Sequence, residues 1–140
     1  MILGLRKLPH CTHACGPSGS VAWRAVRDAA AVIAGGAAGT LARAGLAEAL
    51  PVHPGAWPWA TFVVNVAGTL ILGWVVVARE RWRPLVGTGF CGALTTFSTF
   101  QVQLVELGDD GHVPLAAAYL AVSVACGLVA AAAGAGLARR

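Results

Sequence analysis

Four long apolar segments follow one another along this chain, and they limit what it can fold into. Each contains 21 to 25 residues, and an α-helix needs about 20 apolar residues to cross the hydrocarbon core of a bilayer. Only 11% of the 140 residues are charged, whereas soluble domains have about 25%. The sequence therefore predicts an all-α membrane protein with four transmembrane helices, at about residues 29–50, 58–78, 84–104 and 113–137.

The first 26 residues do not resemble a signal peptide, because the apolar run before Arg6 and Lys7 is too short. A short segment, residues 10–15, contains two His and two Cys, but it lacks the two-cluster spacing of structural zinc sites. We therefore expect a disordered cytoplasmic tail over residues 1–26 and one transmembrane domain over residues 27–140.

The charges are sorted by side. On one side, Glu48 lies near the end of the first segment and Glu106, Asp109 and Asp110 lie between the third and fourth, and the two loops on this side contain no Lys or Arg. Nine of the ten basic residues fall on the opposite side: Arg6, Lys7, Arg24, Arg27, Arg79, Arg81, Arg83, Arg139 and Arg140. Such a bias predicts that both termini of this multi-pass cell-membrane protein face the cytoplasm. Because these residues flank lipid-embedded segments and form no patch with aromatics, they argue against nucleic-acid binding.

The third segment is the least apolar of the four. Three glycines, Gly87, Gly89 and Gly92, precede four hydroxyl residues within residues 95–99. Hydroxyls can bond to backbone carbonyls and loosen a helix, and freed carbonyls at membrane depth can bind a hard cation such as Na⁺. The residues alone leave two interpretations open, a helix broken in mid-membrane and a continuous helix whose hydroxyls are satisfied internally.

Polar residues also share one face in the other segments. In the second segment they are Thr61, Asn65, Gly68 and Thr69, and in the fourth Tyr119, Ser123, Cys126 and Gly127. These groups are neutral, most can donate hydrogen bonds, and no span contains a central carboxylate, which argues against proton-coupled cation export. Neutral donors suit an anion, and so do the electropositive ring edges of Phe97 and Phe100, although both rings could simply be core residues.

Three motifs carry a resemblance to a known family. The run Gly-Ala-Leu-Thr-Thr-Phe-Ser-Thr-Phe at residues 92–100 resembles the third-helix signature of the CrcB/Fluc fluoride channels. Residues 35–43 and 61–69 are similar to the motifs of that family's first and second helices. The motifs occur in the family's order, and the resemblance covers about residues 28–137.

The resemblance implies a passive channel, not an enzyme, that exports cytoplasmic fluoride and lowers its toxicity. It implies two subunits inserted antiparallel, with a structural Na⁺ at the dimer centre held by the backbone carbonyls of Gly92 and Thr95. The fluoride pathway would comprise Asn65, Phe97, Ser98, Thr99, Phe100, Tyr119 and Ser123. Structural roles would fall to Gly35, Gly39, Arg43 and Thr96, the two glycines allowing close helix packing. One position departs from the family, which often has Glu where this chain has Gln103.

The identity of the second subunit is a separate question. A homodimer of antiparallel subunits needs a chain that inserts in both orientations, whereas the charge bias here favours one orientation. We therefore expect a heterodimer with a homologous subunit of opposite topology, with the homodimer as the alternative.

Two other functions stay open. A small multidrug-type exporter would need a Glu in the bilayer core of the first helix, whereas Glu48 lies near its end; Gln103 leaves room for a non-conducting partner subunit.

Overall fold

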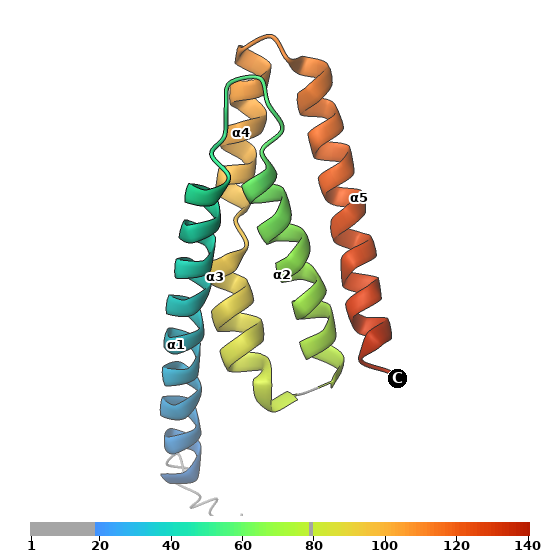
Figure 1. Cartoon of the computed structure of the whole chain (residues 1–140). Helices are drawn as coiled ribbons and strands as arrows, with labels where there is room; N and C mark the ends of the chain where they lie inside the picture. The colour runs from blue at the N-terminus through green and yellow to red at the C-terminus, as the bar shows by residue number, and fades with distance from the viewer. Residues whose placement is uncertain (1–18, 79) are drawn as a thin grey trace, which may run out of the picture.

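The computed structural model describes residues 19–78 and 80–140, and within these ranges it contains helices and no strand. Three helices are long and apolar enough to cross a membrane: α1 (Gly19–Ala49), α2 (Trp59–Ala78) and α5 (Val113–Leu137). A fourth, composite column lies among them (Figure 1). It consists of the 3₁₀ turn η1 (Glu80–Trp82), the π-helix η2 (Arg83–Cys91), the short α3 (Gly92–Leu94) and α4 (Phe97–Asp109). The all-α class predicted from the apolar segments is confirmed for the described residues.

The bounds of two helices follow the sequence prediction and those of two do not. Helix α5 covers residues 113–137 as predicted, and α2 begins one residue later than predicted. Helix α1 begins at Gly19, so the tail prediction is wrong for residues 19–26, while residues 1–18 lie outside the described part. The third column reaches Asp109, beyond the predicted end at 104, and is interrupted after Leu94.

The four columns alternate in direction, so that the start of α1 and the C-terminus lie at the same end (Figure 1). Proline lies in the first turn of both η2 and α5, where a missing amide hydrogen costs little. Gly111 has φ +80° in the turn between α4 and α5, a conformation that L side chains rarely adopt.

Glycines set how closely these columns approach. A Cβ atom at Gly35 or Gly39 would overlap the backbone carbonyls of Leu85 or Phe90 in η2, and one at Gly89 would lie 2.7 Å from the Val32 carbonyl. Helix α1 therefore packs backbone to backbone against η2. The same close approach joins α2 to α5, where a Cβ at Gly73 would lie 2.5 Å from the Ala131 carbonyl.

The outer surface of the bundle is strongly apolar, and few large side chains are fully buried. Exposed Leu, Ile, Val and Trp side chains occur along α1, α2 and α5, as expected for helices that face lipid. The apolar core concentrates at the α4 end, where Phe100, Leu107 and Tyr119 are buried together.

Candidate functional site

The third column is broken at two threonines. Helix α3 ends at Leu94, and Thr95 (φ −76°, ψ 152°) and Thr96 (φ −144°, ψ 118°) are extended before α4 begins. The interruption therefore lies inside the run of hydroxyl residues, and of the two interpretations that the residues left open the structure shows the broken helix. The Thr95 amide still donates to the Cys91 carbonyl at 3.0 Å, but the amide and carbonyl of Thr96 leave the helical ladder and need other partners.

Asn65 of α2 supplies those partners. Its side-chain Nδ2 donates to the Thr96 carbonyl at 3.1 Å, and its Oδ1 accepts from the Thr96 amide at 2.8 Å. The side-chain amide therefore bonds both main-chain groups of one residue, as a neighbouring strand would. We call this pair of hydrogen bonds the Asn65 latch. It ties the break in the third column to α2.

The Thr96 side chain then caps α4. Its Oγ1 accepts a hydrogen bond from the Thr99 amide at 3.2 Å, as in an ordinary N-cap. The same hydroxyl donates to Thr99 Oγ1 at 2.9 Å and lies 3.4 Å from Ser98 Oγ. Three hydroxyls thus gather at the positive end of the α4 dipole, a location that favours negative charge.

The latch and the cap together free two carbonyl groups. In a continuous α-helix, the amides of Thr96 and Thr99 would bond to the carbonyls of Gly92 and Thr95. Here those amides donate to Asn65 and to the Thr96 hydroxyl. The two residues that the resemblance assigns to Na⁺ therefore lose these helical partners, and carbonyl oxygens suit a hard cation. No group of three or more His, Cys, Asp or Glu in the described ranges offers a side-chain alternative.

The two phenylalanines of α4 lie in different surroundings. Their ring centroids are 6.3 Å apart and their planes differ by 28°. Phe97 is 71% exposed, whereas Phe100 is 6% exposed and its ring centroid lies 5.0 Å from that of Tyr119. The Phe97 ring therefore faces away from its own bundle, and the Phe100 ring is part of the core.

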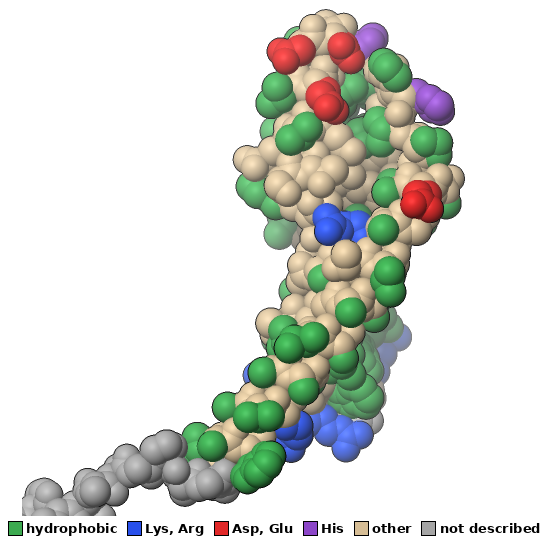
Figure 2. Space-filling view, turned by 90° about the vertical axis from the view of Figure 1, so that its left-hand side faces the viewer, with side chains coloured by type: hydrophobic (Ala, Val, Ile, Leu, Met, Phe, Trp, Pro, Cys, Tyr) green, Lys and Arg blue, Asp and Glu red, His purple; other side chains and the backbone are tan. Residues whose placement is uncertain are grey.

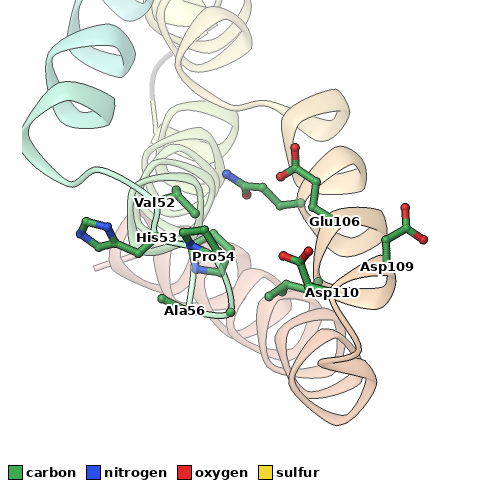
Figure 3. Close-up of a pocket in the computed structure, with 11 residues that line it drawn as sticks. Val52, His53, Pro54, Ala56, Glu106, Asp109 and Asp110 are labelled. Carbon is green, nitrogen blue, oxygen red and sulfur yellow. The ribbon is translucent and has the colours of Figure 1, made fainter.

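Tyr119 and Gln103 form a buried pair behind Phe100. The Tyr119 hydroxyl donates to Gln103 Oε1 at 3.2 Å, and both residues are buried. Because Oε1 is held by Tyr119, the Gln103 NH₂ group is left to other partners. Gln103 also lines a cavity of about 430 Å³ at the end of the molecule where α1 ends and α2 begins. Figure 3 shows Asp110 pointing toward the loop at Pro54, across this cavity, and Asp109 pointing away.

Two buried donors near this pair have no hydrogen-bond partner among the described residues. They are the hydroxyl of Ser123 and the indole Nε1 of Trp57. Buried donors are nearly always satisfied, so these two are exceptions, and both atoms are inaccessible on the single chain. Sequence reasoning named Ser123 but missed Trp57, whose ring centroid lies 5.1 Å from that of Tyr119. The one feature of the sequence that could have drawn attention to Trp57 is its position directly before Pro58, at the start of α2.

Two further cavities flank the break, and Thr96 lines both. One, of about 260 Å³, is bounded by Asn65, Gly92, Thr95 and Phe97 among others. The other, of about 240 Å³, is lined by Arg43 of α1 together with four threonines: Thr40, Thr61, Thr96 and Thr99. Arg43 is half-buried, and the described residues hold no ion-pair partner for it.

Comparison with known proteins gives a consistent assignment. The family model described as "CrcB-like protein, Camphor Resistance (CrcB)" matches residues 30–135. The chain is 50% identical over 111 residues to fluoride-specific ion channel FluC 1 of Mycobacterium tuberculosis (strain CDC 1551 / Oshkosh), covering 74% of this chain and 84% of that protein. It is 46% identical over 120 residues to FluC 1 of Frankia casuarinae, covering 77% and 93%. It is 41% identical over 111 residues to FluC 2 of Streptomyces avermitilis, covering 74% and 70%. This multi-pass membrane protein therefore belongs to the CrcB family.

Proposed function

We propose that the chain is a subunit of a fluoride-selective channel, through which cytoplasmic fluoride leaves the cell down its gradient. The observation that carries the proposal is the 41–50% identity to proteins named fluoride-specific ion channels. The chemistry of the break supports it, because the break gathers neutral hydrogen-bond donors and no carboxylate. The chain belongs to a family of channels and not of enzymes, so it provides a path and performs no reaction.

Fluoride is small and strongly hydrated, so a selective path must replace its water with other donors. The hydroxyls of Ser98, Thr99 and Ser123 supply such donors, and the second hydrogen of Asn65 Nδ2 adds one more. The ring edges of Phe97 and Phe100 add weak positive charge. Tyr119 holds Gln103 in one orientation behind them. In this proposal Asn65 acts mainly through the latch, because both ends of its amide are already engaged.

A structural Na⁺ and a second subunit complete the proposed assembly. The carbonyls of Gly92 and Thr95 would hold the ion, which would supply a fixed positive charge beside the anion path. Gly92 and Phe97 are exposed on the single chain. Their exposure supports the proposal that an antiparallel subunit covers them in the dimer. The charge bias favours a homologous partner of opposite topology over a second copy of this chain.

The small multidrug-type exporter is the weaker alternative. Glu48, the carboxylate that such an exporter would need in the bilayer core, is exposed in the last turn of α1. The other alternative, a non-conducting subunit, would have the same fold and would carry no fluoride itself. Only an experiment can distinguish it from a conducting subunit.

Fluoride efflux from liposomes, recorded with a fluoride electrode, tests the proposal. The purified chain is reconstituted alone and with a homologous subunit, and fluoride efflux is compared with chloride efflux. We expect fast, fluoride-selective efflux in at least one of the two preparations. Fluoride retention in both, or equal chloride efflux, would contradict a fluoride channel.

Two substitutions test the pathway. Ser123→Ala removes a buried hydroxyl that has no hydrogen-bond partner among the described residues. We therefore expect unchanged thermal stability but fluoride efflux about tenfold slower, the equivalent of one hydrogen bond. Phe97→Ile removes the exposed ring and should abolish efflux. Thr88→Ala, which removes an exposed hydroxyl of η2, is the matched control and should conduct normally. Normal efflux in both test variants would refute the assigned path.

A further inference from the structure

A groove lies at the basic end of the molecule, between the first half of α1 and the turn η1. Its volume is about 410 Å³. Arg27 and Arg81 line it from the two sides, and Asp28 lies beside Arg27. Its other lining is apolar: Ala31, Trp82, Pro84 and Leu85. The groove therefore has a charged part next to an apolar part, which suits an amphipathic ligand. Figure 2 shows basic side chains gathered at this end of the molecule.

The pairing of the charges leaves the groove with a net positive charge. Arg27 Nη2 lies 3.4 Å from Asp28 Oδ1. Arg83 lies outside the groove lining; it approaches Glu80 at 4.0 Å and donates to the Val76 carbonyl. Arg81 lies over the Trp82 ring, 5.6 Å from its centroid, and no ion pair is recorded for it in the described ranges. Two arginines against one aspartate give the groove a charge of +1, which complements one phosphodiester.

The length of α1 places this groove at the membrane surface. The helix has 31 residues and is about 46 Å long at 1.5 Å per residue, whereas the hydrocarbon core is about 30 Å thick. Its first part, where Trp23 is 75% exposed, therefore extends beyond the core. Trp82 is also partly exposed at this end. Tryptophans mark the headgroup level of a bilayer, where phosphates and the upper parts of acyl chains are found together.

We propose that this groove binds one anionic phospholipid. The phosphate lies between the guanidinium groups of Arg27 and Arg81, and an acyl chain follows the apolar lining past Leu85. A basic pocket between membrane helices is suited to an anionic headgroup. Phosphatidylglycerol has the single negative charge that the groove complements, whereas phosphatidylcholine has none. The proposal does not depend on fluoride conduction, because the residues of the groove line none of the cavities at the break.

Native mass spectrometry of the full chain, released from detergent with added phosphatidylglycerol or phosphatidylcholine, tests the proposal. We expect selective retention of phosphatidylglycerol. Arg81→Gln should weaken this binding about fivefold, the equivalent of about 1 kcal/mol for one charge. Asp28→Asn should strengthen it by a similar factor, because it removes the negative charge from the groove. A tighter complex cannot result from damage to the fold, so this variant keeps the test informative.

Arg24→Gln is the matched control, since Arg24 is an exposed arginine of the same helix that does not line the groove. It should leave phosphatidylglycerol binding nearly unchanged. The proposal is overturned if Arg24→Gln and Arg81→Gln weaken binding equally, or if Asp28→Asn does not strengthen it. It is also overturned if phosphatidylcholine binds as well as phosphatidylglycerol. Displacement of the lipid by millimolar glycerol phosphate would point to a site for a free anion and would equally overturn it.

Discussion

Asn65 is the side chain that ties the break in the third column to another helix, α2. Its amide bonds both the carbonyl and the amide of Thr96, at 3.1 and 2.8 Å. An Asn or Gln amide provides a donor and an acceptor side by side without taking up a proton, and the shorter Asn suits the close approach of α2 to the break. A residue that the resemblance assigns to the fluoride path is therefore also a residue that holds the break in its observed shape.

The latch predicts the effect of Asn65→Asp, which keeps the acceptor and replaces the donor with a second acceptor. The new carboxylate would face the Thr96 carbonyl without a hydrogen between them, and the carbonyl would lose its partner. We expect a loss of about 1–3 kcal/mol in the free energy of unfolding, measured as a lower melting temperature in detergent. Fluoride efflux should fall as the break loses its shape.

Thr69→Val is the matched control for this substitution. The Thr69 hydroxyl lies one turn further along α2 and donates to the Asn65 carbonyl at 2.6 Å, within its own helix. Its loss leaves the break untouched, so the melting temperature should change little. Equal melting temperatures for Asn65→Asp and the native protein would show that the latch does not stabilise the break.

The elements show which parts of this fold hydropathy can predict. The length of an apolar run fixes a transmembrane helix, so α2 and α5 were predicted to within one residue. The first ten residues of α1 were missed because they carry three charged side chains, and a hydropathy pattern detects the membrane span but not its helical extension. The run of hydroxyl residues indicates where the break lies. The hydrogen bonds between Asn65 and Thr96 could not be predicted, because the two residues belong to different columns and no sequence pattern pairs them. The π-helical form of η2 was also not predicted.

The contact between α1 and η2 depends on backbones that nearly touch. A Cβ at Gly39 would overlap the Phe90 carbonyl, so Gly39→Ala must push the two elements apart. We expect a loss of about 1–3 kcal/mol in the free energy of unfolding, measured by thermal unfolding in detergent. Gly45→Ala on the same helix is the control, because a Cβ there meets nothing within 4 Å. It should be neutral or stabilising by up to about 1 kcal/mol. The packing argument fails if the two variants unfold alike.

At the scale of the whole molecule, the charge is divided between two ends. Figure 2 shows acidic side chains gathered toward one end and most of the basic ones toward the other, and at the basic end Asp28 and Glu80 lie close to Arg27 and Arg83. The antiparallel course of the helices produces this division, because it brings the start of α1, the turn η1 and the end of α5 together (Figure 1). Positively charged ends are retained on the cytoplasmic side during insertion. A chain with this distribution should insert in one orientation, which bears directly on what its second subunit can be.

Reporter fusions at the two termini test this expectation. We expect a cytoplasmic reporter such as a fluorescent protein to be active, and a periplasmic reporter such as alkaline phosphatase to be inactive, at both ends of the chain. Replacing Arg81 and Arg83 with Gln should raise the inverted fraction, since it removes two of the positive charges on which the expected orientation depends. Equal populations of both orientations in the native chain would contradict fixed insertion, and a homodimer would then suffice.

If the orientation is fixed, an antiparallel channel requires a homologous subunit of the opposite charge bias, and only coexpression with such a subunit should yield fluoride efflux.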